Sequence, residues 1–305
     1  MVDCNNKMEK QLSYSIIIPH KNTPELLQRC LDSIPQRDDI EAIVIDDNSD
    51  PQKVDFNQFP GNDRKDITIV FDKTNKGAGH ARNIGLERIR GQWLLFADAD
   101  DYFYPNTFDI LDKYKESDND IIYFYFNARD GVTNELIPDR VPNIKKGIDN
   151  KDYNLLRYNS YSPCGKFIRR TFIIEHHINF EEVIAANDVM FSTMVGFYAH
   201  KISTISEPLY CATRNSGSLF FSPDVNKIKS RILVASRSNH FLYQHGLQRY
   251  RQLGINWVFF FFPKHPLLFI WAIFKMRYEG DNILYLRLLT QKFMDRLRGK
   301  FKRLK

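Results

Sequence analysis

The chain has 305 residues and a net charge of +6, with 43% hydrophobic and 26% charged residues. This composition is close to the globular average and excludes a disordered or fibrous protein, and the length predicts one large domain or two. Its cysteines form no Cys-x-x-Cys pair, so we expect reduced thiols and neither a disulfide framework nor a zinc site. The polar, charged start up to Ser13 does not resemble a signal peptide, which favours a cytoplasmic protein.

The positive charge is concentrated at one end of the chain. Residues 275–305 hold ten Lys and Arg against three acids, a net charge of +7, which leaves residues 1–274 with −1. A basic segment next to apolar sequence favours an anionic membrane surface as partner, and we expect no nucleic acid.

Short apolar runs alternate with helical patterns up to about residue 126. Strands are predicted at 14–18, 42–45, 67–71, 93–96 and 121–124, and helices at 24–34, from the glycines at 77 and 79 to about 90, and from 105. Buried strands separated by helices form right-handed βαβ units, so the sequence predicts an α/β fold with a mostly parallel sheet flanked by helices. Beyond about residue 150 the pattern is mixed, with short strands near 167, 202 and 209 and helices near 172 and 191.

Carboxylates follow two of these strands directly. Asp46 and Asp47 come after the second strand, and Asp98, Asp100 and Asp101 after the fourth. Because ligands of open parallel sheets bind beyond the carboxyl ends of the strands, these acids should meet at one edge. An Asp-x-Asp turn suits Mg²⁺ or Mn²⁺, which complete their coordination with phosphate oxygens and water. The simpler alternative is that the acids only cap the following helices.

Several segments occur in the order typical of one enzyme family. They are Ser15-Ile-Ile-Ile-Pro-His-Lys-Asn22, Val44-Ile-Asp-Asp-Asn-Ser49, Asn75-Lys-Gly77, Ala81-Arg-Asn-Ile-Gly85 and Asp98-Ala-Asp-Asp101. With them the chain resembles the family 2 glycosyltransferases, which have a GT-A nucleotide-sugar-binding fold. Lys21 departs from the pattern, since an aromatic residue is more usual there.

The resemblance assigns roles to these residues. It implies that Asp47 holds the nucleotide base, that Asp98 contacts the ribose side of the donor, and that Asp100 ligates the metal on the diphosphate. The other candidate nucleotide-sugar-binding residues are Pro19, His20, Asn22, Gly79, Arg82 and Ala99. From the residues alone, Gly79 is equally well a turn before a helix, and Arg82 equally well lies on an exposed helix face. The histidines show no metal-ligand spacing and are expected mostly at the surface.

A second block extends the resemblance to the acceptor side. Residues 163–170 and 178–181 resemble the family's acceptor-side segment, and Asn187-Asp-Val-Met-Phe191 stands where an acidic-Asp-x-x-Phe helix start is usual. The Asp at that place is the family's general base, which makes Asp188 the catalytic candidate. The alternative is that Asp188 only caps its helix. Lys166 and Arg214 are candidates for acceptor or donor contacts.

These residues predict a reaction type. A metal stabilises the charge on a departing nucleoside diphosphate, and a carboxylate can take the proton of the attacking hydroxyl. One general base with no enzyme nucleophile implies a single displacement with inversion, which the family resemblance also implies.

The resemblance covers about residues 13–220. We therefore expect a catalytic GT-A domain at 1–220, with a donor-binding half at 13–126 and an acceptor half at 127–220, and a helical C-terminal region at 221–305. In that region, residues 255–274 are apolar but carry two prolines and a lysine near their centre, so an interfacial or re-entrant hairpin fits better than a membrane span. The basic tail at 275–305 would then lie on anionic headgroups. The alternative is a helical hairpin packed on the catalytic domain or forming a dimer.

The sequence thus predicts an inverting, metal-dependent glycosyltransferase, peripheral on the inner face of the cell membrane. It would move a sugar from a nucleotide sugar, with UDP favoured by family frequency, to a saccharide or lipid-linked saccharide in capsule, lipopolysaccharide or other surface-glycan synthesis. Two alternatives stay open. One is a non-catalytic nucleotide-binding relative, which would lack the metal ligand or the base, and the other is a membrane-scaffold protein acting through its basic tail.

Overall fold

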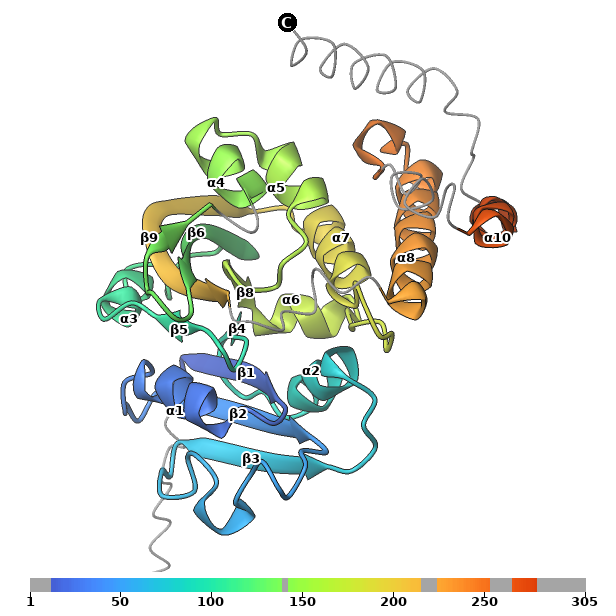
Figure 1. The fold of residues 1–305 in the computed structure, drawn as a ribbon. Helices are drawn as coiled ribbons and strands as arrows, with labels where there is room; N and C mark the ends of the chain where they lie inside the picture. The colour runs from blue at the N-terminus through green and yellow to red at the C-terminus, as the bar shows by residue number, and fades with distance from the viewer. Residues whose placement is uncertain (1–11, 139–141, 215–223, 253–264, 279–305) are drawn as a thin grey trace, which may run out of the picture. The chain divides into compact units, whose positions relative to one another are not determined.

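The computed structural model describes residues 12–138, 142–214, 224–252 and 265–278 (Figure 1). The chain divides into two compact units, Met1–Ser222 and Pro223–Lys305. The first unit contains a nine-stranded sheet with helices, and the described elements of the second are helical.

The N-terminal half of the sheet is parallel. Its strands lie in the order β3-β2-β1-β4 and pair in parallel throughout, with the bounds β1 (Tyr14–His20), β2 (Ile40–Asp47), β3 (Ile67–Asp72) and β4 (Trp93–Phe96). The connections include α1 (Pro24–Asp32), the short η1 (Phe56–Gln58) and α2 (Ala78–Leu86). All four predicted strands are therefore confirmed, although α2 ends at Leu86 and not near residue 90.

Both faces of this half are covered, which is why its strands read as continuous apolar runs. Ile17 of β1 packs against Gly85 of α2. Tyr14, at an odd spacing from Ile17 and so on the opposite face, packs edge-on against Phe108 of α3 (Thr107–Leu111) at a centroid distance of 5.7 Å. The sheet thus separates two helical layers.

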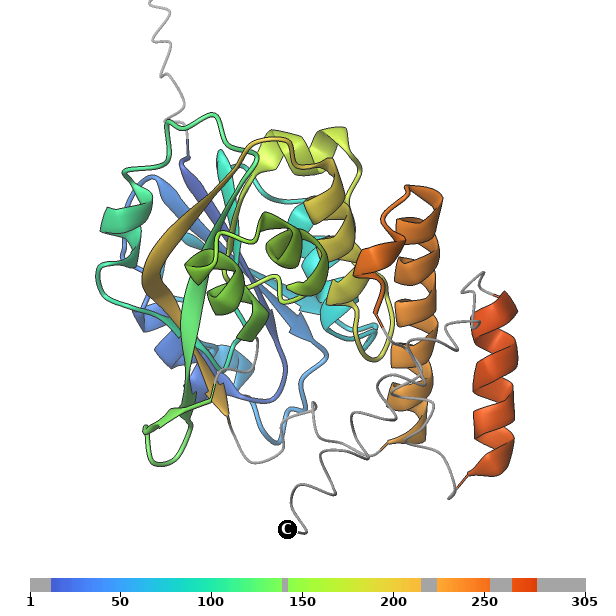
Figure 2. The same ribbon diagram turned by 90° about the horizontal axis from the view of Figure 1, so that it is seen from above.

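The other half of the sheet is mixed. The order continues as β8-β6-β9-β5, with the bounds β5 (Tyr102–Phe103), β6 (Ile121–Asp130), β8 (Lys166–Arg169) and β9 (Ile202–Arg214), and β7 (Leu136–Ile137) pairs with β6. Strand β8 is antiparallel to both β4 and β6, whereas β6 and β9 are parallel. The separate strands expected near residues 202 and 209 are one long strand, β9 (gold in Figure 2). It stays paired with β6 across a register shift between Phe124 and Phe126.

Four helices pack around this half. They are α4 (Pro142–Asp149), α5 (Tyr153–Asn159), α6 (Arg170–Glu175) and α7 (Asp188–Tyr198). The helices near Phe172 and Phe191 are the predicted ones, whereas α4 and α5 were not foreseen. Gly196 lets α7 approach α5 closely, because a Cβ there would lie 2.1 Å from the carbonyl oxygen of Arg157.

The second unit contains α8 (Val225–Gln244), η3 (Gln248–Tyr250) and α10 (Pro266–Tyr278). Ile228 and Ile232 of α8 pack with Ala272 and Met276 of α10 in a small separate core. Within the described ranges, no helix has both the length and the apolar character needed to cross a bilayer. Of the hairpin predicted at 255–274, residues 255–264 lie outside the described residues, as do residues 279–305 of the basic tail.

Candidate active site

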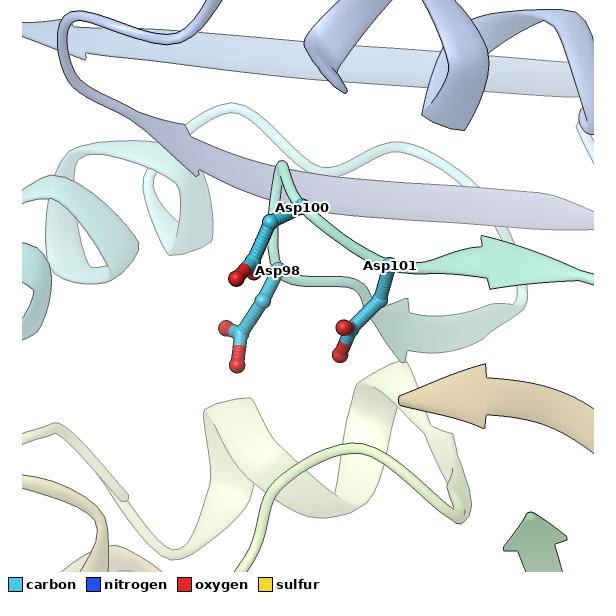
Figure 3. A group of neighbouring side chains, drawn as sticks. All are labelled: Asp98, Asp100 and Asp101. Atoms are coloured by element: carbon cyan, nitrogen blue, oxygen red, sulfur yellow. The ribbon is translucent and has the colours of Figure 1, made fainter. Parts of the chain in front are cut away.

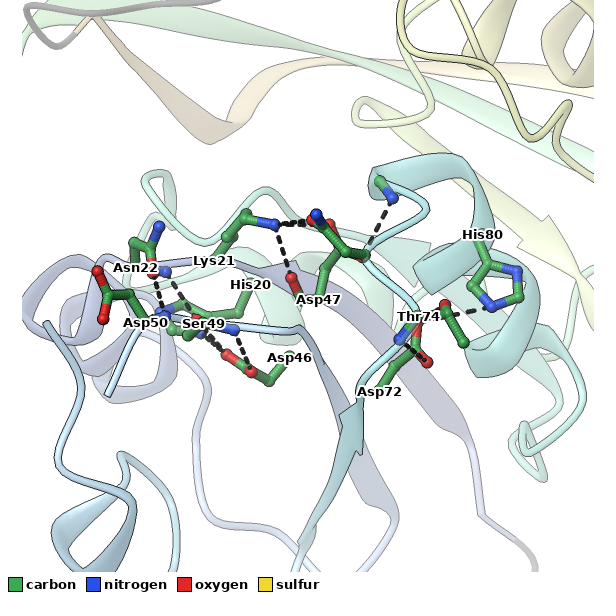
Figure 4. Close-up of polar contacts among 12 residues, drawn as sticks. His20, Lys21, Asn22, Asp46, Asp47, Ser49, Asp50, Asp72, Thr74 and His80 are labelled. Atoms are coloured by element: carbon green, nitrogen blue, oxygen red, sulfur yellow. Dashed lines mark hydrogen bonds and ion pairs between the residues drawn. The ribbon is translucent and has the colours of Figure 1, made fainter. Parts of the chain in front are cut away.

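A buried hydrogen-bond network joins the loops after β1 and β2 (Figure 4). The Nε2 atom of His20 accepts from the Thr23 amide at 3.1 Å, so Nδ1 carries the proton that points to Oδ2 of Asp46 at 2.8 Å. Asp46 also accepts from the amide and hydroxyl of Ser49. Burial alone would raise the pKa of Asp46, but the hydrogen bonds from His20 and Ser49 outweigh it and lower this pKa.

This network corrects two expectations for His20. The residue is 2% exposed and therefore does not lie at the surface, and both ring nitrogens are already hydrogen-bonded within the protein. Asn22 has a supporting position too: its amide donates to Ser49 Oγ, and its Oδ1 accepts from the Asp50 amide. Its positive φ of 59° suits an Asn at the turn. Pro19, within β1, is half-buried.

Asp47 lies beside this network and faces a different set of partners. Its Oδ1 accepts from the Gly77 amide at 3.1 Å. The Lys21 ammonium donates to the Asp47 backbone oxygen at 2.8 Å, to its Oδ2 at 3.3 Å, and to Oδ1 of Asn75. The Lys21 side chain is 40% exposed, so its ammonium lies within reach of solvent. The residue that departs from the family pattern is therefore bonded to the residue expected to hold the base.

The acidic turn after β4 brings three carboxylates together (Figure 3). Asp98, Asp100 and Asp101 each offer one oxygen, and these oxygens lie within 4.8 Å of one another. Asp98 and Asp100 are partly exposed, whereas Asp101 is 2% exposed. Clustered carboxylate oxygens are the donors that a hard divalent cation takes, so the residues present fit Mg²⁺ or Mn²⁺.

Asp101 is held from behind by strand β9. The Tyr210 hydroxyl donates to its Oδ2 at 2.9 Å and accepts from the Asp98 amide at 2.9 Å, so one hydroxyl joins two residues of the turn. The Thr213 amide donates to Oδ1 at 2.7 Å. Burial, with the nearby charges of Asp100 and Asp98, raises the pKa of Asp101 well above its usual range. Asp101 therefore supports the turn, and the two partly exposed acids are the better candidate ligands.

Arg82 connects the acidic turn to the second motif block. Its guanidinium donates to Asp98 Oδ1 at 2.7 Å and to Asn187 Oδ1 at 2.9 Å, and it lies over the Phe180 ring at 5.3 Å. The residue is 6% exposed, which excludes the alternative of an exposed helix face. Arg82 thus couples the predicted donor side to the residue next to Asp188.

Helix α2 supports the whole segment that leads to Asp188. Asn83 binds both backbone atoms of Phe180, at 2.8 and 3.0 Å, and His80 bonds Glu182 at 2.8 Å. A Cβ at Gly79 would lie 2.4 Å from the Glu181 carbonyl oxygen. Gly79 is therefore explained by close packing rather than by phosphate binding. Ala99 is likewise buried in the core.

Asp188 is the first residue of α7. The N-cap is Asn187, whose side chain makes no capping bond. Asp188 stands one residue beyond the N-cap, in the first turn, where an acidic side chain also stabilises the helix. Burial raises the pKa of Asp188, and the positive charges of Arg82 and Lys166 oppose this increase. A carboxylate with a raised pKa takes up a proton more readily than an exposed one, which suits a general base.

The two candidates for acceptor or donor contacts, Lys166 and Arg214, lie at different places in the fold. Lys166 has no exposed surface, and its ammonium donates to Ser160, Ser162 and Ser192, so the predicted substrate contact does not fit this position. Arg214 ends β9, one residue after Thr213, and so lies near the acidic turn.

Several residues of the site were not foreseen from the sequence. Arg29 of α1 donates to the backbone oxygen of Asp100 and to Thr213 Oγ1, and Tyr210 and Thr213 hold Asp101. These partners lie 71 to 113 residues from the turn in the chain. No local motif signals them, because the contacts depend on the sheet order.

The geometry agrees with similarity to known proteins. The family described as Glycosyl transferase family 2 matches residues 15–176, more than half of the chain. Poly(ribitol-phosphate) beta-N-acetylglucosaminyltransferase TarS of Staphylococcus aureus (strain MW2) is 27% identical over 228 residues, covering 70% of this chain and 38% of TarS. The chain thus matches well under half of the length of that relative. Glycosyltransferase GlyG of Streptococcus pneumoniae serotype 4 is 28% identical over 228 residues, covering 67% of this chain and 72% of GlyG.

Solved structures agree at the level of the fold. The crystal structure of S. aureus TarS 1–349 in complex with UDP-GlcNAc matches with a TM-score of 0.61 and 23% identity, covering 84% of this chain and 75% of that one. The complex of the same TarS fragment with UDP gives a TM-score of 0.58 at 21% identity, over 84% and 74% of the two chains.

Proposed function

The chain belongs to glycosyl transferase family 2 and has the GT-A fold, and we propose that it transfers a sugar from a nucleotide sugar to a saccharide acceptor. The observation that carries this proposal is the convergence of three elements in the first unit: the Asp47 loops, the acidic turn and the start of α7. Arg82 bridges the last two through Asp98 and Asn187.

We propose a UDP-sugar as donor. The resemblance assigns the base to Asp47, and the TarS structures with UDP and UDP-GlcNAc support the same nucleotide. Asp47 offers a carboxylate that can accept the N–H of a uracil ring, and the Lys21 ammonium could serve a ring carbonyl if it gave up one of its present bonds to Asp47 or Asn75. A base with alternating acceptor and donor groups complements this pair.

A divalent cation, Mg²⁺ or Mn²⁺, would be held by Asp100 together with Asp98. When bound, it would stabilise the negative charge of the departing nucleoside diphosphate. The chain's own contribution is to fix the turn that carries Asp98 and Asp100. Tyr210 accepts from the Asp98 amide and donates to Asp101, and Arg29 donates to the backbone oxygen of Asp100.

Asp188 is proposed as the general base that takes the proton of the acceptor hydroxyl. Its half-buried carboxylate and its cationic neighbours support this role. With one base and no enzyme nucleophile, the sugar would pass to the acceptor in a single displacement with inversion.

The acceptor is proposed to be a saccharide or lipid-linked saccharide of a surface glycan. Relatives named for poly(ribitol-phosphate) and for teichoic acid support that class. The domain roles follow: residues 13–126 for the donor and 127–220 for the acceptor, ahead of a C-terminal region from 221.

We further propose that α10 holds the protein peripherally on the inner membrane surface. Leu267, Ile270, Phe274 and Tyr278 are exposed and recur every three or four residues, so they form one apolar stripe. Ala272 and Met276, on the opposite side, are buried against α8. Lys275 and Arg277 stand in the last turn, where they would meet anionic headgroups.

Donor binding tests the catalytic proposal. UDP-, GDP- and CDP-sugars are titrated with and without Mn²⁺ into the full chain and into Asp100→Ala. We expect the UDP-sugar to bind only when Mn²⁺ is present, and we expect Asp100→Ala to abolish this binding. Failure to bind any nucleotide sugar, with or without Mn²⁺, would favour a non-catalytic relative.

Vesicle flotation tests the membrane proposal. The full chain should float with vesicles containing phosphatidylglycerol and should float less after Leu267→Glu with Phe274→Glu. Val132→Glu is the matched control, because Val132 is equally exposed but lies in the first unit. Equal flotation of the double variant and the wild type would refute the role of the stripe, and flotation absent from all of them would refute membrane contact.

A further inference from the structure

A lysine without exposed surface lies beneath the first turns of α7. Lys166 opens β8, and its ammonium donates to the carbonyl oxygens of Ser160, at 2.9 Å, and Ser162, and to Oγ of Ser192 at 3.2 Å. All three acceptors are neutral oxygens. Burying an ammonium is costly, and neutral acceptors offset only part of that cost, so packing alone does not explain the choice of lysine.

Ser192 ties this lysine to the helix of the proposed base. Its hydroxyl donates to the Tyr161 carbonyl oxygen at 2.5 Å and is itself buried. Ser192 follows Asp188 by four residues, so the two lie on the same side of α7, one turn apart. Lys166 and Ser192 therefore attach α7 to the loop at 160–163, one helical turn from Asp188.

The charges around this position come from every packed element. Asp188 is faced by Arg82 from α2, by Lys166 from β8 and by Asp98 from the turn after β4. Lys166 lies near Asp188, near Cys164 in the preceding loop, and 5.9 Å from the centre of the Tyr123 ring of β6. Burial lowers the pKa of Lys166 to about 7, so its ammonium is fully charged below neutral pH, where the acidic limb of a pH profile lies. Of the two cations near Asp188, Arg82 is hydrogen-bonded to the carboxylate of Asp98. The hydrogen bonds of Lys166 go to neutral oxygens instead.

We propose that Lys166 is a positioning residue for the reaction: it fixes the start of α7 against the 160–163 loop and supplies the positive charge that keeps Asp188 in its basic, ionised form. This inference rests on the proposed role of Asp188 as general base. It explains why a charged side chain occupies a fully buried site that a substrate does not reach.

The pH profile of kcat/KM separates charge from structure. Because a nearby cation favours the ionised carboxylate, Lys166→Met should move the midpoint of the acidic limb to higher pH, by about one unit. Ser192→Ala is the matched variant: it removes the hydrogen bond to the helix but keeps the charge, so its midpoint should stay at the wild-type value even if kcat falls. Lys201→Met, which removes an exposed lysine paired with Asp118, controls for loss of one charge.

Each outcome decides one of the two proposals. If Asp188→Asn retains the wild-type rate, the proposed base is wrong. If Asp188→Asn is inactive but Lys166→Met keeps the wild-type midpoint, the base stands and the role of Lys166 is refuted. Should Lys166→Met fail to fold, Lys166→Gln and Lys166→Arg replace it: the neutral Gln must shift the midpoint and the charged Arg must not. A shift of equal size in both would also refute the proposal.

Discussion

The two sides of the site hold their carboxylates in different ways. On the β1–β2 side, Asp46 is bonded to His20, 26 residues away, and to Ser49, three residues away. On the side of the acidic turn, Asp101 is bonded to Tyr210 and Thr213, 109 and 112 residues away. The first side is thus built from the loops that follow two neighbouring parallel strands. The second side depends on contacts with β9, which is distant in the chain.

The difference extends to the electrostatics. Hydrogen bonds outweigh burial at Asp46 and lower its pKa, whereas burial and neighbouring acids raise the pKa of Asp101. On the β1–β2 side, which we call the frame, the buried carboxylate of Asp46 is fully hydrogen-bonded. On the acidic turn, which we call the charged side, three carboxylates lie close together. Accumulated charge of this kind destabilises a fold and is typical of a ligand site. We therefore expect substitutions on the two sides to affect different quantities.

The largest effect should come from the proposed base, Asp188, which Arg82 and Asn187 link to the acidic turn. Asp188→Asn removes proton acceptance but keeps the size of the side chain, so we expect transfer to slow by about 10² to 10⁴-fold. Donor affinity should change little, because the nucleotide side is untouched. Initial transfer rates and calorimetric donor titrations measure the two quantities. A rate within tenfold of wild type would remove Asp188 from the mechanism.

Loss of the Tyr210 hydroxyl should come next. Tyr210→Phe leaves the Asp98 amide and one oxygen of buried Asp101 without their partner, so we expect a loss of about 1–3 kcal/mol in the free energy of unfolding. Because the turn also loses its anchor, the transfer rate should fall by about tenfold or more.

Tyr123→Phe is the matched control for Tyr210→Phe. Tyr123 is equally buried, but its hydroxyl has no hydrogen-bond partner in the described part of the chain. Its removal should leave urea unfolding and transfer nearly unchanged. Equal effects of the two substitutions would show that the Tyr210 hydroxyl has no special role.

The same contrast explains what the sequence could reveal. The β-strands, the acids after them and the start of α7 could be read from local patterns, because apolar runs and adjacent motifs determine them. The burial of Arg82 and Lys166 could not be read from the sequence. Both are long cations, yet they are buried among carbonyl, amide and carboxylate oxygens. Such partners arise from tertiary packing and leave no spacing in the chain.

On the frame side, Ser49→Ala should have a smaller effect. The Ser49 hydroxyl donates to Asp46 and accepts from the Asn22 amide, so we expect a loss of about 1–2 kcal/mol in the free energy of unfolding. Because Asp47 lies in the same loop, KM for the donor should rise while kcat changes little. A fall in kcat as large as that of Tyr210→Phe would contradict the division between frame and charged side.

The smallest effect concerns the pH dependence of that loss. The Ser49 hydrogen bonds help to lower the pKa of Asp46 in the folded state, so their stabilisation is fully present above the unfolded pKa of about 3.9 and is lost as pH falls through the folded pKa. The difference in unfolding free energy between wild type and Ser49→Ala should therefore shrink from pH 6 to pH 3. Ser33→Ala is the control, because the Ser33 hydroxyl donates to the Cys30 carbonyl oxygen and accepts from the Phe103 amide, neither of which titrates. Its difference should stay constant over the same range, and a parallel decrease in both variants would mean that acid acts on the whole sheet and not on Asp46.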